Sequence, residues 1–260
     1  MDFKVKGHSD SNISIRCNEN TNIVVKESAN IRLLKSIKKH QQFNSNWFKS
    51  PKIHDIYPEL NPNIAYTMDF INGYSFFEFL NLSSKNDLDK FITKLEGYFN
   101  ETILDTIRVP TNIFVNKLNS IDYYNEYHYI FEGIKYVNIY TGQCHGDMTL
   151  SNMIFKEYDV YLIDFLDSYI ESPTMDLIKL RQDTHLHWSF NMIDTRKADL
   201  MKSKISLKYI DTWIIDTYNI HEYHILQIIN LIRILPYTHD TSLKNFIQSK
   251  IKMLWETRKI

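Results

Sequence analysis

The sequence contains few of the residues that mark several protein classes. It has two cysteines, Cys17 and Cys144, and only six glycines and six prolines in 260 residues. Two cysteines are too few for a disulfide framework or a four-cysteine zinc site, and they fit a reducing, cytoplasmic compartment. Apolar runs are short and interrupted, and residues 1–4 lack the apolar stretch of a signal peptide. We therefore expect neither a membrane span nor secretion.

The charge of the chain also excludes classes of partner. Thirty basic side chains face 31 acidic ones, and the lysines are spread along the chain. This balance leaves no basic footprint for nucleic acid. No period of 20 to 50 residues recurs, which excludes solenoids and propellers. With 43% hydrophobic residues the chain can form a substantial core.

The first seventy residues predict a small antiparallel sheet with one helix. Residues 12–17 and 22–26 alternate around a polar turn, which is the pattern of a hairpin. Apolar side chains then recur at helical spacing over residues 28–43, and residues 53–56 and 65–70 predict two further strands.

After Gly73 the pattern becomes mainly helical. Residues 88–104 and 112–124 show helical spacing, and so does the chain from Pro173 onwards. Two short β runs interrupt it, at 152–155 and 160–163, around a turn at 156–159. The sequence thus predicts an α+β fold with an N-terminal sheet lobe, 1–71, and a larger helical C-terminal lobe, 72–260.

The chemically informative residues lie around this predicted hairpin. Before the first β run stands the triplet His145-Gly146-Asp147, and Asn152 lies five positions after Asp147. The second β run leads into Ile163-Asp164-Phe165. Phosphoryl transfer needs one carboxylate to accept the proton of the nucleophile and oxygen ligands to hold Mg²⁺ against a triphosphate. Pairing of the two strands would bring the three side chains Asp147, Asn152 and Asp164 to one point.

This pattern resembles the signature of the aminoglycoside phosphotransferase and choline kinase superfamily, which are small-molecule kinases with a bilobal, protein-kinase-like fold. The resemblance implies that Asp147 is the catalytic base and that His145 organises the loop. It also implies that Asn152 and Asp164 bind Mg²⁺ and that ATP, or GTP, is the phosphoryl donor.

The resemblance also assigns residues upstream. Lys26 would contact the α- and β-phosphates, Ser9 and Ser11 lie where the family has a glycine-rich loop, and Met68 and Phe70 belong to the strand that would meet the adenine. One departure concerns the helix after Lys26. Residues 30–43 contain no carboxylate to pair with the lysine, and Gln41 or Gln42 is the alternative partner, so we leave the partner unassigned.

Several other side chains have ordinary interpretations beside functional ones. Residues 166–177 resemble the family segment that ends in Asp-Leu, and the resemblance implies that Asp176 braces the catalytic loop, whereas Asp167 remains open between a role at the metal or substrate and a turn carboxylate. Cys144 has no base at a recognised spacing, so nucleophilic catalysis is not expected. His185 and His187 with Asp183 suggest either a metal site or a solvated pair of histidines, and the solvated pair is favoured. Trp188, Trp213 and Tyr237 are candidates for a substrate pocket or for core packing, and core packing is favoured for each.

The charge of the C-terminal part bears on the acceptor. Residues 185–260 hold eleven Lys or Arg against seven acids, an excess of four positive charges. A polycationic aminoglycoside would prefer an acidic site, so a neutral or anionic hydroxyl compound is favoured, with choline still open. The sequence predicts an ATP- and Mg²⁺-dependent phosphotransferase acting on a hydroxyl of a small metabolite such as a sugar or amino alcohol. The alternatives are an inactive nucleotide-binding pseudokinase or scaffold, an aminoglycoside-modifying kinase, and a protein kinase, which the short segment after Asp164 disfavours.

Overall fold

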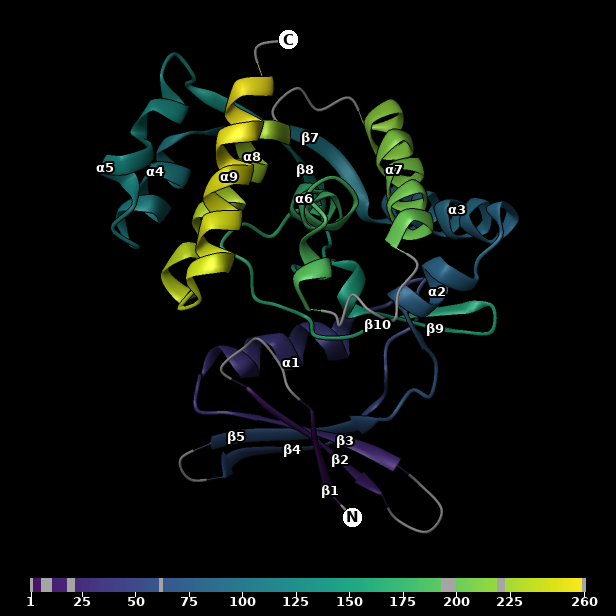
Figure 1. Ribbon diagram of the computed structural model, residues 1–260. Helices are drawn as coiled ribbons and strands as arrows, with labels where there is room; N and C mark the ends of the chain where they lie inside the picture. Colours follow the sequence, from purple (N-terminus) through teal and green to yellow (C-terminus); the bar gives the residue numbers. More distant parts are fainter. Residues whose placement is uncertain are drawn as a thin grey trace.

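The computed structural model describes residues 2–5, 11–17, 22–60, 63–192, 200–218 and 223–258. It consists of an antiparallel sheet with one helix at one end and a mostly helical part at the other, with a small hairpin, β9–β10, near their junction (Figure 1). The predicted α+β class is confirmed. The predicted boundary after residue 71 falls in the segment between β5 and β6.

The five-stranded sheet has the order β1-β2-β3-β5-β4, and every neighbouring pair is antiparallel. Its strands are β1 (Asp2–Val5), β2 (Asn12–Cys17), β3 (Asn22–Ser28), β4 (Ile53–Leu60) and β5 (Asn63–Asp69). One helix, α1 (Arg32–Gln42), buries Leu33 and Ile37 against Ile64, Tyr66 and Met68. This second, small core fixes α1 to the sheet.

The rest of the chain forms a larger, mainly helical core. Its helices are α2 (Phe76–Leu82), α3 (Lys85–Thr102), α4 (Asn112–Asn119), α5 (Tyr124–Tyr127), α6 (Pro173–Thr184), α7 (Leu200–Thr217), α8 (Tyr223–Ile232) and α9 (Thr241–Thr257), with 3-10 turns η1 (His128–Phe131), η2 (Leu150–Asn152), η3 (Trp188–Met192) and η4 (Leu235–Tyr237). Capping boxes begin α2 and α3, at Ser75 with Glu78 and at Ser84 with Asp87. Among the described residues no helix is long and apolar enough to cross a membrane.

The region between Gly73 and residue 143 is less helical than the sequence pattern predicts. Strands β7 (Ile103–Pro110) and β8 (Tyr136–Gly142) pair there into a two-stranded sheet. The β7 sequence alternates between polar and apolar residues only over 106–109, and most of the strand is exposed, so its strand signal is weak. The helix expected over 112–124 is also broken after Asn119, where Asp122 adopts a φ of 59° that an α-helix does not allow.

The hairpin that carries the predicted site forms within one residue of its expected limits. Strands β9 (Met153–Lys156) and β10 (Asp159–Leu162) pair antiparallel, and the short strand β6 (Tyr74–Ser75) adds a third member beside β9. Lys49, in the segment before β4, bridges to Tyr161. The hairpin is therefore attached both to the sheet part and to the helical part.

Candidate active site

Three oxygen-bearing side chains predicted from the sequence lie in one cleft. Asp147 belongs to the loop between β8 and β9, Asn152 ends η2 directly before β9, and Asp164 follows β10. Together with Lys26 of β3 they line a cavity of about 580 Å³. Pairing of the hairpin strands produces this convergence, because it returns the end of β10 to the start of β9.

The Asp147 and Asn152 side chains contact each other directly. The Nδ2 atom of Asn152 donates to the Asp147 carbonyl at 2.8 Å and to its Oδ2 at 3.1 Å. The amide oxygen of Asn152 is then the end left for a cation. The Asn152 carbonyl also accepts from the Ile163 N–H at 3.0 Å, which connects the loop to the segment that holds Asp164.

Asp164 adopts a backbone conformation that most residues avoid. Its φ is 62°, in the left-handed region, where aspartate is tolerated better than bulkier residues. The carboxylate forms an ion pair with the ammonium of Lys26, whose side chain is only 6% exposed. Strain of this kind persists where the surroundings enforce it, and it concentrates at functional sites.

The partner of Lys26 is therefore not on α1. Gln41 and Gln42, the alternatives suggested by the sequence, are both exposed, because the helix turns another face inward. That face carries His40, whose Nε2 lies 2.8 Å from the Pro51 carbonyl oxygen. Burial lowers the pKa of His40 to about 4, so the ring next to Lys26 is neutral near pH 7.

His145 is fully buried and organises the loop. Its Nδ1 accepts the Asp147 backbone N–H at 3.2 Å, so the proton of the neutral ring belongs on Nε2, which lies 2.9 Å from the Ile163 carbonyl oxygen. Burial lowers the pKa of His145 to about 4. Both nitrogens are thus occupied by backbone groups, and the ring has no free position for proton transfer to a substrate.

Asp176, at the start of α6, braces the same loop. Its carboxylate accepts the backbone N–H groups of His145 at 2.6 Å and Gly146 at 2.7 Å, and the Tyr98 hydroxyl at 3.1 Å. Burial raises the pKa of Asp176 to about 6, against the effect of the N–H donors. Sequence reasoning expected this bracing role.

Two further residues of α6 reach the loop and were missed as loop contacts. The ammonium of Lys179 lies 3.0 Å from Oδ1 of Asp147, and Asp183 accepts the Leu150 N–H at 2.6 Å. With Asp176 these residues occupy positions i, i+3 and i+7 of one helix, which is a single face. That spacing is the sequence signal that identifies them, and it places Asp183 in the loop support and not with His185 and His187.

The charge state of Asp147 suits a base. Burial acts to raise its pKa, but Lys179, His145 and Asn152 together outweigh burial, and the pKa of Asp147 is lowered from its ordinary value. The carboxylate is therefore ionised at neutral pH and is able to accept a proton.

Gly146 allows close approach between the loop and the segment after Asp164. Its φ is +90°, and a Cβ added there would lie 2.2 Å from the Leu166 carbonyl oxygen and 2.9 Å from Nζ of Lys39. Only glycine fits this conformation and this space.

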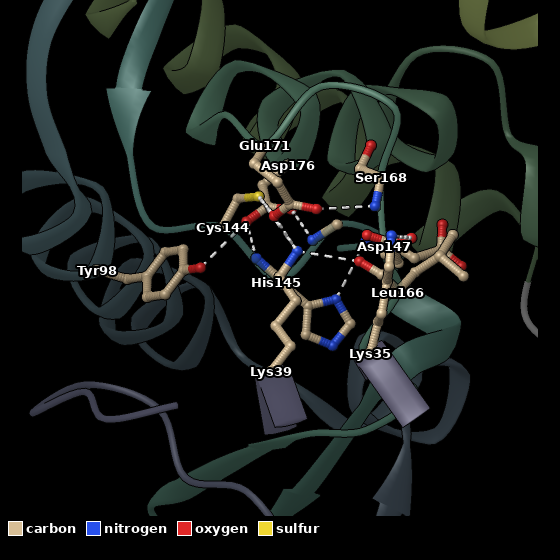
Figure 2. A network of polar contacts seen from close by, with 12 residues as sticks. Lys35, Lys39, Tyr98, Cys144, His145, Asp147, Leu166, Ser168, Glu171 and Asp176 are labelled. Atoms are coloured by element: carbon tan, nitrogen blue, oxygen red, sulfur yellow. Dashed lines mark hydrogen bonds and ion pairs between the residues drawn. The ribbon is translucent and has the colours of Figure 1, made fainter. Parts of the chain in front are cut away.

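A network centred on Lys39 ties α1 to Cys144 and to the segment after Asp164 (Figure 2). The Lys39 ammonium donates to the Leu166 carbonyl at 3.0 Å, to Glu171 at 2.5 Å and to the Cys144 sulfur at 3.4 Å. Burial acts to lower the pKa of Lys39, but the groups around the ammonium, the Glu171 carboxylate among them, raise it above its ordinary value. Burial also raises the pKa of the Cys144 thiol, so this cysteine is a protonated member of the network.

A second α1 lysine makes a parallel contact. Lys35 lies 3.3 Å from the Asp167 carboxylate, which gives that residue, left open by the sequence, a partner across the junction. The α1 helix thus presents cations to the segment after Asp164 and has no carboxylate facing Lys26.

Much of the cavity lining is apolar. Met68 and Phe70 belong to it, as do Ile13, Ile15, Val24, Tyr66, Ile71, Ile154 and Ile163. Such a lining suits a planar base between sheet and hairpin. Ser11 comes just before β2 and does not line the cavity, and Ser9 lies outside the described residues.

The three aromatic residues considered for a substrate pocket, Trp188, Trp213 and Tyr237, lie in different environments. Trp188 lines the same cavity and is 9% exposed, Trp213 packs edge-on against Tyr218 at 5.7 Å, and Tyr237 is 65% exposed. Trp188 is therefore part of the cavity lining, Trp213 belongs to the packing of the helical core, and the core packing expected for Tyr237 is not found.

The donor set fits Mg²⁺ bound with a nucleotide. Over the described ranges no three His, Cys, Asp or Glu side chains gather into a complete metal site. Mg²⁺ is usually held by one or two protein oxygen ligands together with substrate phosphates and water, not by a full protein cage. Asn152 and Asp164 provide hard oxygen atoms of that kind beside a cavity large enough for a nucleotide.

Comparison with known proteins identifies the fold. No family model and no curated protein sequence matches the chain. Among solved structures, a thermostable mutant of aminoglycoside phosphotransferase APH(4)-Ia superposes with a TM-score of 0.66 at 8% identity, covering 99% of this chain and 94% of that one. The GDP and kanamycin complex of APH(2")-IIia gives a TM-score of 0.60 at 13% identity, covering 100% and 93%.

A third neighbour is the streptomycin–ATP complex of APH(2")-IIa, with a TM-score of 0.56 at 15% identity, covering 99% of this chain and 91% of that one. The agreement extends over nearly whole chains in all three cases. The protein therefore has the protein-kinase-like fold of the aminoglycoside phosphotransferases, and the fold expected from the motif is confirmed.

Proposed function

We propose that the protein is a Mg²⁺-dependent phosphotransferase that transfers the γ-phosphoryl group of ATP or GTP to a hydroxyl of a small molecule such as a sugar or amino alcohol. The observation that carries this proposal is the convergence of Asp147, Asn152, Asp164 and Lys26 on one cavity. Fold alone does not define a function, but this set of groups supplies what phosphoryl transfer requires from a protein.

Asp147 takes the role of base. Its lowered pKa keeps it ionised, and Asn152 and Lys179 hold the carboxylate from two sides. The carboxylate is then positioned to align the acceptor hydroxyl and accept its proton. Lys179 also places a positive charge where the transferred group would develop negative charge.

Asn152 and Asp164 are the residues that would hold Mg²⁺. When bound, the ion neutralises charge on the phosphates. Lys26, buried under the sheet beside Asp164, is the side chain that would meet the α- and β-phosphates. The apolar lining that includes Met68 and Phe70 would receive the base.

The decisive experiment separates catalysis from binding. Asp147→Asn should lower kcat by about 10² to 10⁴, the usual contribution of a general base, and leave the Kd for Mg-nucleotide unchanged. Asp216→Asn, an exposed residue of α7, is the matched control and should leave both unchanged.

The same measurements test the alternative of an inactive nucleotide-binding protein. The intact protein should release ADP with at least one member of a panel of sugars, amino alcohols and aminoglycosides. Mg-nucleotide stabilisation in a thermal-shift assay without any ADP release would favour the pseudokinase. A loss of nucleotide binding equal to the loss of turnover in Asp147→Asn would make that residue structural.

A further inference from the structure

Three cations from distant segments act on one another electrostatically, and one of them, Arg233, directly precedes a residue that lines the cavity of the proposed site. They are Arg32, the first residue of α1, Lys117 of α4, and Arg233, which follows α8. None takes part in an ion pair between residues that the structure describes. Burial and then repulsion from Arg233 and Arg32 lower the pKa of Lys117, so the three charges act on one another.

Aromatic packing holds the centre of this cation cluster (Arg32, Lys117 and Arg233) in place. The Arg233 guanidinium lies 4.1 Å from the centroid of the Tyr169 ring, and the Phe114 ring meets Tyr169 edge-on at 6.3 Å. Phe114 and Lys117 are three residues apart on α4, so they share one side of that helix. Three segments distant in the sequence therefore meet around Tyr169.

Two buried polar atoms at this centre lack a partner. Within the described part of the chain, Nε of Arg233 and the hydroxyl of Tyr169 make no hydrogen bond. Leaving a buried donor unpaired is costly, and for a charged donor the cost is greater. An acceptor atom from a ligand would satisfy both groups.

Arg233 lies next to the wall of the cavity that contains the base. Burial lowers the pKa of Arg233, and the charge of Asp147 acts on it in the opposite direction, which places the two groups within electrostatic reach. Ile234, next along the chain, lines the cavity that contains Asp147 and Lys179, but none of the three cations does. Through Ile234, Arg233 is therefore adjacent to the wall of the cavity in which Asp147 would meet the acceptor.

Resting on the proposed function, we propose that Arg32, Lys117 and Arg233 bind an anionic group, a carboxylate or a phosphate, of the acceptor. The substrate is then a hydroxyl compound that carries its own negative charge. A guanidinium on a fixed aromatic ring presents paired N–H donors to the two oxygens of such a group. A polycationic aminoglycoside would meet like charges at the same place.

The test uses the full chain with saturating Mg-AMP-PNP and pairs of polyols that differ in charge. We would measure Kd for glycerol against D-glycerate and glycerol 3-phosphate, and for sorbitol against D-gluconate. The anionic member of a pair should bind at least about tenfold more tightly, the factor expected from one charge-assisted contact. The carboxylate and phosphate probes distinguish which anion the cluster takes.

Substitutions assign the preference to the cluster. Lys117→Gln and Arg32→Gln should each weaken binding of the anionic probes several-fold and leave the neutral polyols unchanged. Arg233→Lys, which keeps the charge, should retain more of the preference than Arg233→Gln. Arg108→Gln is the matched control, because Arg108 also covers a tyrosine ring, that of Tyr136 at 5.2 Å, but on β7.

The outcomes separate this inference from the proposed function. Four results would each overturn the anion site. They are equal binding of charged and neutral polyols, no binding of any anionic probe, binding of kanamycin that is tighter than that of the anionic probes, and an effect of Lys117→Gln on the Kd of Mg-AMP-PNP alone. Selective binding of anions without ADP release from any acceptor would support the site and refute the phosphotransferase. ADP release with neutral or cationic acceptors only would do the reverse.

Discussion

Replacing Lys39 by Met should weaken the attachment of α1 to the segment that follows Asp164. Methionine keeps the stem of the side chain and removes the ammonium that contacts Leu166, Glu171 and Cys144. A charged donor on a backbone carbonyl contributes about 1.5–3 kcal/mol. Because Glu171 is 49% exposed, its ion pair adds at most about 1 kcal/mol after solvent screening. We expect the free energy of unfolding to fall by about 2–3 kcal/mol.

The assay is urea denaturation with linear extrapolation, in a double-mutant cycle of Lys39→Met with Glu171→Gln. The coupling energy should be about 0.5–1 kcal/mol. Since Leu166 is two residues beyond Asp164, the Kd for Mg-nucleotide should also rise several-fold. Lys38→Met, one position along α1 and exposed, is the control and should change neither quantity. Equal effects of the two lysine substitutions, or zero coupling, would refute the assignment of Lys39 as the link.

Three other substitutions test the loop that contains Asp147 and the helix α6 that supports it. Gly146→Ala should destabilise the protein by at least about 2 kcal/mol in thermal unfolding and reduce turnover, because its Cβ would displace the Leu166 carbonyl at a φ of +90°. Arg181→Met removes the buried guanidinium that pairs with Asp211 and leaves that carboxylate only the Thr184 hydroxyl and the His185 ring, so it should cost about 3 kcal/mol in urea denaturation while nucleotide affinity of the folded protein is retained. Asp176 has a folded pKa of about 6, above its ordinary 3.8, so its contribution to stability is fully present below pH 4 and is lost as the pH rises through 6. Asp176→Asn should therefore remove a decline on the order of 3 kcal/mol over that window in denaturation curves recorded from pH 4 to 7.

The fold and the centre of the site were predictable because their signals are local. The hairpin strands alternate, their turn is short, and pairing alone brings Asn152 and Asp164 together. The stretch that forms β7 was not predictable in the same way. It is exposed on most positions and pairs with β8 some thirty residues later, so neither burial nor a nearby turn marks it as a strand.

The partner of Lys26 shows where residue-by-residue transfer from a family pattern fails. The pattern requires a carboxylate on the following helix, and the search for a substitute led to Gln41 and Gln42. The amphipathic phase of α1 turns both outward and brings Lys39 to the junction. In this protein α1 therefore supplies a cation, and the segment after Asp164 supplies the acceptors, whereas the pattern expects a carboxylate on the helix. The residues that accept from Lys39 are Glu171 and the Leu166 carbonyl, and both lie in the helical part of the molecule. The family pattern concerns Lys26 only and therefore does not indicate these contacts.

The supporting residues of α6 show what the motif itself omits. Asp176, Lys179 and Asp183 each contact a different point of the loop: the His145 and Gly146 amides, the Asp147 carboxylate, and the Leu150 amide. A helix is rigid over these two turns, so the three contacts fix the loop as one body and not residue by residue. The position of Asp147 is then set by α6 as much as by the hairpin. For this reason Asp183→Asn, which weakens the contact with the Leu150 amide, should alter the alignment of Asp147 and lower kcat without touching the groups that would hold Mg²⁺.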